Sequence, residues 1–402
     1  MQTNELVHTE HYRTSHPSQP PHLVGLPSDD GDSRPPSDRV AVLLAGYGEV
    51  TSYRDLNRYN QAATQYIAAQ FLPIPHWLYP LAGRILALQD LYKFGAKHHQ
   101  FISPENEIFE KQRSGIQELL QKRWGESFDG TSHERVRVFK GFYFCQPFVQ
   151  EVIADIIEQG FEHLLIYPLL VVDSAFTGAI AIAQVNEAIA VSNAQLNSHH
   201  SPFKSVRYIP AFATEPAYIG LIVRQLEEAL TQPSVSQFSE SRIGIILTVH
   251  GGPDQAQGLL TGVIDGQALC DAVRSQLQSR YPLISIGWVN HDMPLIKWSQ
   301  PNLKQAAKSL IKAGAQAILF KPLGWATENY ETILDVEDAI QSLRRSFSDV
   351  TYVQLECVNN DPDFLKIAAK WADPHIETML GAQSIAVKLT RAVISMERDP
   401  DT

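Results

Sequence analysis

The chain has 402 residues, of which 44% are hydrophobic and 19% are charged, and its formal net charge is −11. This size and composition predict two soluble α/β domains, and the negative charge argues against nucleic acid as the main partner. No apolar run is long enough to span a membrane, which leaves at most peripheral contact with a membrane surface, and the three widely spaced cysteines argue against a disulfide framework or a Cys-based metal site.

Residues 1–39 hold six prolines among Ser, Thr, His and Asp, without apolar periodicity. Such a segment buries too little surface to offset the entropy of ordering, so we predict a disordered N-terminal tail. It has neither the apolar core of a signal peptide nor an Arg-rich, acid-poor transit pattern. A cytoplasmic location is therefore the expectation.

The first folded segment is a buried strand over 40–46, followed by an amphipathic helix within 52–71. Residues 72–98 combine three prolines with Trp, Tyr and Leu, which predicts a lip with an exposed apolar side or, equally, ordinary packing. Ser103-Pro104 then marks the start of a helix that continues to 123, and a strand is expected over 135–144.

An internal repeat follows. QPFVQEVIADIIEQGFEHLLIYPL (146–169) aligns with QPNLKQAAKSLIKAGAQAILFKPL (300–323) at a constant offset of 154 residues. Each copy predicts a helix, a glycine that ends it, a buried strand and a Pro-Leu turn. Two related α/β halves explain this repeat better than chance does.

The predicted fold is therefore α/β, with two similar Rossmann-like halves, each a parallel four-stranded sheet flanked by helices, and a cleft between them. The first half is expected over 40–205 and the second over 206–396, the latter closing with helices at 363–372 and 375–396. A helix is expected at 215–230 and strands at 283–289 and 350–355.

The first strand expected in the second half lies in the stretch Ile-Gly-Ile-Ile-Leu-Thr-Val-His-Gly-Gly-Pro (243–253). A buried parallel strand would present His250 at its carboxyl end, where open α/β sheets bind ligands. Tyr47 stands at the matching place in the first half. Glu328 and Glu331 follow another strand end and are three positions apart.

An imidazole and a carboxylate together can ligate a borderline divalent metal or accept protons. His250 and Glu331 are thus the candidate catalytic and metal-binding residues, with Tyr47 as a phenol facing them. The alternatives are a histidine satisfied in a loop and a glutamate that only favours a helix N-terminus. A loosely held, passing metal fits better than a structural one, because no H-E-x-x-H or His/Asp/Glu triad is present in the sequence.

Taken together, these motifs resemble those of ferrochelatases, over about residues 40–375. GWATENYETILD (324–335) resembles the family's G-F-x-S-D-H-x-E-x-L-x-D signature, and the strand ending in His250 resembles the strand of its catalytic histidine. Further matching segments are Ser103-Pro104 with Gln112, Tyr167-Pro168 with Ser174 and Thr177-Gly178, Pro294 with Trp298 and Pro301, and Cys357-Val358-Asn359-Asn360.

The resemblance implies an enzyme that inserts ferrous iron into a porphyrin, coproporphyrin III or protoporphyrin IX, in haem biosynthesis. It implies catalysis and metal handling by His250 and Glu331. It also implies substrate binding by Tyr47, Ser174, Thr177, Trp298 and Glu328, and iron as a substrate with no retained cofactor.

The sequence departs from the family pattern at Glu328-Asn329, where Asp-His is usual, and at Thr248-Val249, where Ser-Ala is usual. The lip lacks the family's basic segment for porphyrin carboxylates, whereas Tyr47 resembles the tyrosine of the branch that uses coproporphyrin. Three alternatives stay open: a haem or tetrapyrrole carrier without turnover, a chelatase for another metal or ring such as cobalt and sirohydrochlorin, and a periplasmic-type metal-binding protein.

Overall fold

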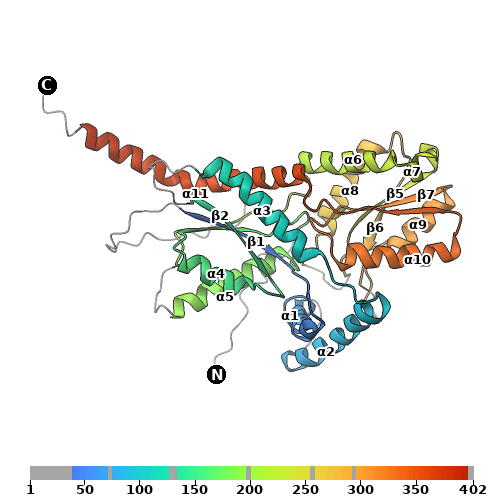
Figure 1. Ribbon diagram of the computed structural model, residues 1–402, viewed down its shortest axis with the longest axis horizontal. Coiled ribbons are helices and arrows are strands. Elements are labelled where there is room, and N and C mark those ends of the chain that lie inside the picture. Colours follow the sequence, from blue (N-terminus) through green and yellow to red (C-terminus); the bar gives the residue numbers. More distant parts are fainter. Residues whose placement is uncertain are drawn as a thin grey trace.

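The computed structural model describes residues 39–70, 75–125, 134–195, 201–253, 259–291 and 296–396, with side chains up to Gly381 apart from Ala69. Two four-stranded parallel sheets form its framework, and helices flank both of them (Figure 1). The α/β class and the two similar halves expected from the sequence are confirmed. The tail predicted over 1–39 lies outside the described residues, apart from its last position.

The first sheet has the strand order β2-β1-β3-β4. All seven residues of β1 are buried, because helices cover both faces of this central strand and its apolar sequence needs no polar partner. The strands are β1 (Val40–Gly46), β2 (Val136–Phe142), β3 (His163–Tyr167) and β4 (Ser205–Tyr208). The helices are α1 (Leu56–Tyr66), α2 (Tyr79–Asp90), α3 (Glu105–Trp124), α4 (Val149–Glu158) and α5 (Gly178–Gln195).

The second sheet repeats this arrangement in the order β6-β5-β7-β8. Its strands are β5 (Ile243–His250), β6 (Leu283–Val289), β7 (Ala317–Pro322) and β8 (Thr351–Gln354). The helices are α6 (Pro216–Leu230), α7 (Pro233–Ser236), α8 (Val263–Leu277), α9 (Leu303–Lys312), α10 (Val336–Ser346) and α11 (Pro362–Met396), and a π-helical turn, η6 (Glu331–Asp335), precedes α10. In each sheet the chain leaves the central strand on one side and returns on the other, which is the switch point where α/β proteins bind ligands.

The predicted repeat is present in three dimensions. Helix α4 and strand β3 correspond to α9 and β7 at the offset of 154 residues found in the sequence. Gly160 and Gly314 both have positive φ, 72° and 105°, where each helix turns into its strand. Only glycine adopts this left-handed conformation without a steric cost, so the glycine in each copy ends the helix.

Two expectations about the second half need correction. The boundary placed between residues 205 and 206 divides β4, which pairs with β3 in the first sheet, so the first sheet extends to Tyr208. The two closing helices are one continuous helix, α11, with Pro374 in its interior. Figure 1 shows α11 running beside α3, and α11 also contacts α6, so this helix packs on both halves.

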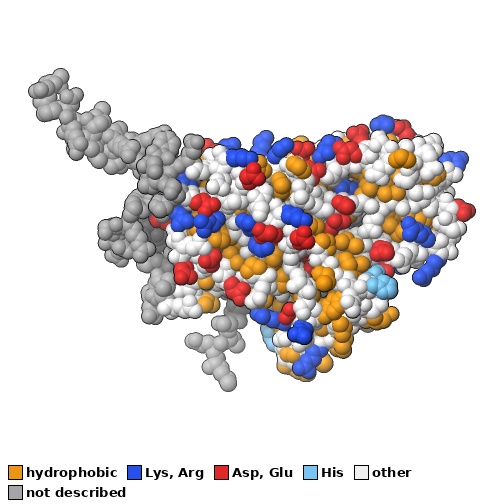
Figure 2. Space-filling model, viewed as in Figure 1, with side chains coloured by type: hydrophobic (Ala, Val, Ile, Leu, Met, Phe, Trp, Pro, Cys, Tyr) orange, Lys and Arg blue, Asp and Glu red, His pale blue; other side chains and the backbone are white. Residues whose placement is uncertain are grey.

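The region between β1 and α3 forms a projection from the first half, made of α1, α2 and the π-helical turn η4 (Leu91–Lys97). Its outer side is apolar, as predicted for a lip: Trp77 is 77% exposed and Leu88 is 66% exposed. Figure 2 shows apolar side chains gathered over this projection. Within the described residues, no helix combines the length and apolar character needed to cross a membrane.

Candidate functional site

A cavity of about 470 Å³ lies where the carboxyl ends of both sheets meet the projection formed by α1, α2 and η4. Its walls include residues one or two positions after the ends of β1, β3, β5 and β7, so both switch points contribute to a single site. Most of the lining is aliphatic and aromatic, and a small number of polar groups point inward, as is typical of a small-molecule site.

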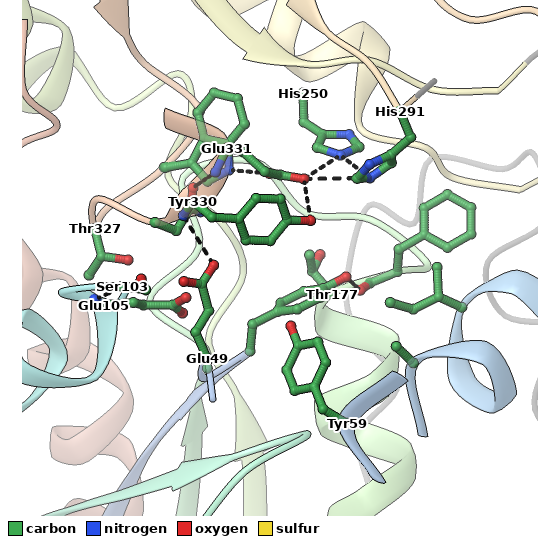
Figure 3. A pocket seen from close by; sticks show the side chains of 18 of the residues that line it. Glu49, Tyr59, Ser103, Glu105, Thr177, His250, His291, Thr327, Tyr330 and Glu331 are labelled. Carbon is green, nitrogen blue, oxygen red and sulfur yellow. Dashed lines mark hydrogen bonds and ion pairs between the residues drawn. The ribbon is translucent and has the colours of Figure 1, made fainter. Parts of the chain in front are cut away.

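Three polar side chains meet on the second-half side of this cavity (Figure 3). His250 Nε2 lies 3.4 Å from Glu331 Oε1 and 3.3 Å from His291 Nε2, and His291 Nε2 lies 3.4 Å from the same carboxylate oxygen. His250 is the last residue of β5, His291 follows β6, and Glu331 opens η6. The carboxyl ends of neighbouring parallel strands share one edge of the sheet, which is why these distant positions converge.

The tautomer of His250 follows from its neighbours. Its Nδ1 lies 2.6 Å from the Gly251 carbonyl, which can only accept, so Nδ1 donates and Nε2 keeps its lone pair toward the cavity. Burial alone would lower the pKa of His250, but Glu331 and the Gly251 carbonyl outweigh burial and raise it above 6.5. The imidazole is therefore a stronger base than free histidine.

Glu331 is 8% exposed and is held on both carboxylate oxygens. Trp325 Nε1 donates to Oε2 at 3.2 Å, and the Tyr330 hydroxyl donates to Oε1 at 3.4 Å. Burial alone would raise the pKa of Glu331, but His250 and His291 lower it to about 2. Glu331 is thus an anion at neutral pH, fixed in a position where it can stabilise a cation.

The three side chains form a group that can bind a metal ion, since one ligand atom of each lies within 4.8 Å of the others. Two imidazoles and one carboxylate are suitable ligands for a borderline divalent metal such as Fe²⁺. Metal–ligand bonds of about 2.1 Å at tetrahedral to octahedral angles separate ligand atoms by about 3.0–3.4 Å. The observed separations of 3.3–3.4 Å therefore suit one shared ion.

A second set of acids lines the cavity from the first half. Glu49 follows β1 and Glu105 is the first residue of α3, and they are 8% and 6% exposed. Glu49 Oε1 accepts a hydrogen bond from the Tyr330 backbone at 3.2 Å, and Glu105 Oε1 accepts one from the Gly48 backbone at 3.3 Å. Burial raises the pKa of both carboxyls, that of Glu105 to about 8.

Most of the side chains expected to face the cleft do line the cavity: Tyr47, Ser174, Thr177, Trp298, His250 and Glu331. The Tyr47 hydroxyl donates to the Phe176 carbonyl, and its ring lies edge-on to Phe144 with centroids 5.4 Å apart. Thr177 Oγ1 lies 3.0 Å from Ser174 Oγ, which holds the loop after β3 against the cavity. Trp298 is 9% exposed, with its ring 5.3 Å from that of His291.

Glu328 is the exception, and its expected place beside Glu331 in the cleft was wrong. It is absent from the cavity lining among the described residues, and its Oε2 accepts a hydrogen bond from Asn359 Nδ2 at 2.9 Å. The Glu328 backbone N–H also donates to Asn359 Oδ1 at 3.0 Å. Gln112 joins the same region by donating to the Ala326 and Asn359 carbonyls, so Gln112, Glu328 and Asn359 connect three of the sequence motifs beside the cavity.

His291, Glu49 and Glu105 were not among the residues selected from the sequence. A signal for His291 was available: it follows the strand predicted at 283–289, and the end of that strand falls on the same sheet edge as His250. Pro294, which belonged to one of the motifs, lies outside the described residues.

Comparisons with known proteins show what this chain is similar to. The family model for Ferrochelatase matches residues 39–376. The ferrochelatase of Geobacter sp. (strain M21) is 23% identical over 307 residues, which cover 73% of this chain and 86% of that protein. The ferrochelatase of Rippkaea orientalis (strain PCC 8801 / RF-1) is 24% identical over 344 residues, covering 83% and 81%. Among solved structures, SirB from Bacillus subtilis with Fe3+ aligns at 13% identity and a TM-score of 0.47, covering 86% of this chain and 98% of that one.

Proposed function

The chain belongs to the ferrochelatase family, and from this premise we propose that it inserts ferrous iron into a porphyrin as a step of haem biosynthesis, with coproporphyrin III and protoporphyrin IX as the candidate rings. Iron is then a substrate that passes through the site. The observation that supports this best is the meeting of His250, His291 and Glu331 at one wall of an apolar cavity.

Insertion of a divalent metal requires two pyrrole N–H groups to lose their protons. His250 Nε2 accepts the two protons one at a time and releases each of them to solvent, and the Glu331 anion at 3.4 Å stabilises the imidazolium that forms each time. Because Trp325 and Tyr330 hold the carboxylate in place, little reorganisation is needed when this charge appears.

The remaining walls would grip the macrocycle. Tyr47 and Tyr59 approach it from the first half, and Trp298 and Trp325 from the second. Chelation needs a bent ring, so that a pyrrole lone pair faces the metal, and enzymes supply such strain from binding contacts remote from the reacting atoms. Aromatic walls on two sides, supported by separate sheets, suit that task.

The test is anaerobic incubation with Fe²⁺ and either coproporphyrin III or protoporphyrin IX, followed by absorbance. We expect the free-base spectrum to give way to that of the metalloporphyrin, with at least one of the two rings. Tight ring binding without insertion would instead identify a tetrapyrrole carrier. Insertion of cobalt into sirohydrochlorin alone would identify a chelatase for another ring.

A further inference from the structure

We propose that Lys93, which lies on η4 of the projection, is a positioning residue for Glu331 in the second half, and that it acts through Tyr330 and Asp335. The inference rests on the proposed insertion reaction and adds a residue to it. It also makes the placement of Glu331 depend on the projection, which belongs to the other half of the chain.

Lys93 contacts the turn that carries Glu331. Its Nζ lies 2.6 Å from Oδ1 of Asp335, the last residue of η6. The same Nζ lies 4.7 Å from the centre of the Tyr330 ring. Since Tyr330 directly precedes η6, a single ammonium group contacts the residues at both ends of this turn.

Tyr330 connects Lys93 to the carboxylate of Glu331. The Tyr330 hydroxyl donates to Glu331 Oε1 at 3.4 Å, and this oxygen also lies 3.4 Å from His250 Nε2 (Figure 3). The Tyr330 ring packs against the projection, with its centre 5.4 Å from that of the Phe94 ring. A cation over the face of an aromatic ring is attracted to the ring, so Lys93 helps to fix the plane of Tyr330 and the direction of its hydroxyl.

The second half supports the backbone of this turn by itself. Asn329 Oδ1 accepts hydrogen bonds from the N–H groups of the first two residues of η6, both at 3.0 Å. Gln354 Nε2 donates to the carbonyls of the second and third residues, at 2.8 and 3.0 Å. The turn should therefore stay folded without Lys93, whose contribution is to orient the side chains at the two ends of the turn.

The position of the Glu331 carboxylate matters for the rate. It has to lie against His250 when the imidazole takes up a proton, and a charge that is already in place stabilises the new cation without a cost of reorganisation. A misplacement of about 1 Å in a reacting group can slow an enzyme by roughly 10²-fold. Loss of Lys93 should therefore lower kcat, although the contacts of Lys93 are with Tyr330 and Asp335.

The indole of Trp325 gives a measurement that needs no activity. Its Nε1–H donates to Glu331 Oε2 at 3.2 Å, so the indole N–H resonance of Trp325 reports where the carboxylate lies. The chain has six tryptophans, and Trp325→Phe would assign the signal. In NMR spectra of the isotope-labelled full chain, we expect Lys93→Met to move this resonance toward its position in Glu331→Gln. Lys93→Arg keeps the charge and should leave the resonance near its original position.

Kinetics give the second measurement. With Fe²⁺ and a porphyrin, Lys93→Met should lower kcat by roughly 10–10²-fold, while the Kd of the metal-free ring from fluorescence titration stays nearly unchanged. Asp335→Asn removes the partner of Lys93 and should have the same effect, which keeps the test open if one variant does not fold. Near-UV circular dichroism identifies the folded variants.

Lys97→Met is the matched control. Lys97 also joins η4 to the second half, but its Nζ pairs with Asp338 of α10, at 2.5 Å, beyond the turn that carries Glu331. This variant loses an ion pair between the same two parts of the protein. It should change neither kcat nor the indole resonance of Trp325.

Two results would overturn the proposal: an unmoved Trp325 resonance in the folded Lys93→Met chain, or a kcat that this change leaves intact. Among the described residues, Lys93 is the only lysine or arginine that lines the cavity, so a raised Kd with an intact kcat would identify it as an anchor for the ring. If the unmodified chain inserts no metal into any ring, the proposed function fails, and the indole resonance still decides whether Lys93 positions Glu331.

Discussion

Replacing Glu331 by glutamine should destabilise the protein by an amount that rises and falls with pH. The buried carboxylate has its pKa lowered from 4.5 to about 2 by the two facing imidazoles. Each unit of pKa corresponds to about 1.4 kcal/mol, so the charged form gains about 3 kcal/mol from the folded environment. Glutamine has a similar shape but no charge, and it loses this electrostatic contribution.

The direction of the pH dependence follows from both partners. A carboxyl with a lowered pKa contributes its stability above about pH 4.5 and loses it as the pH falls toward 2. An imidazole with a raised pKa, as at His250, contributes fully below pH 6.5 and loses its contribution as the pH rises through its folded pKa. The stability difference between the natural chain and the variant should therefore be largest between pH 4.5 and 6.5.

Urea unfolding at about pH 3, 5.5 and 9 would measure this difference. Glu328→Gln is the matched control: it removes one carboxylate three residues away that is bonded to Asn359 outside the cavity. Its stability change should show no maximum near pH 5.5. A difference for Glu331→Gln that is independent of pH, or absent at about pH 5.5, would refute the charge pairing on which the mechanism depends.

Further predictions concern the site and the chain around it. His250→Ala should slow metal insertion by roughly 10²–10⁴-fold, since the proton acceptor is lost, while fluorescence titration still detects porphyrin binding. His291→Ala should raise the KM for Fe²⁺ by roughly 10–100-fold or more, because replacing residues that only support metal ligands already weakens metal binding by that factor. An unchanged KM would show that His291 does not belong to the metal group. Deletion of residues 1–38 should leave melting temperature and activity nearly unchanged, and a drop of several degrees would contradict the predicted disorder. Gly48→Ala should cost roughly 1–3 kcal/mol in urea unfolding, because Gly48 has a φ of +67° and an added Cβ would lie 2.5 Å from Cys145 Sγ.

The sheet framework could be predicted because its signals are local and repeated. A buried apolar run followed by glycine identifies β1 and β5, and the gap-free repeat identifies the paired helices and strands. The continuous helix α11 was missed because proline usually ends a helix by removing a donor and crowding the preceding turn. Nothing in the sequence around Pro374 shows that both halves pack along this helix and stabilise it.

Only the site residues that follow the end of a strongly apolar strand could be predicted from the sequence. His250 and Glu331 followed strongly apolar strands, whereas Glu49 and Glu105 become neighbours only when α3 packs on β2 and Asn106 of α3 bonds the Glu49 backbone. Glu328 was placed wrongly because a three-residue spacing brings side chains together only inside a helix. Here η6 begins at Glu331, so Glu328 still belongs to the preceding turn and points toward Asn359.

The position of α11 determines which part of the protein can move to admit a ring. Tyr167 of β3 donates to the Ala368 carbonyl of α11, and apolar residues of both sheets and of α11 belong to one continuous core. A hinge motion that separated the two halves would expose that core to water. The cost of that exposure makes the halves a single cooperative folding unit. We expect any motion that admits a ring to occur in the projection of α1, α2 and η4, whose helices pack mainly on each other. Such a motion would have to release the Lys93–Asp335 and Lys97–Asp338 ion pairs, which join η4 to the second half.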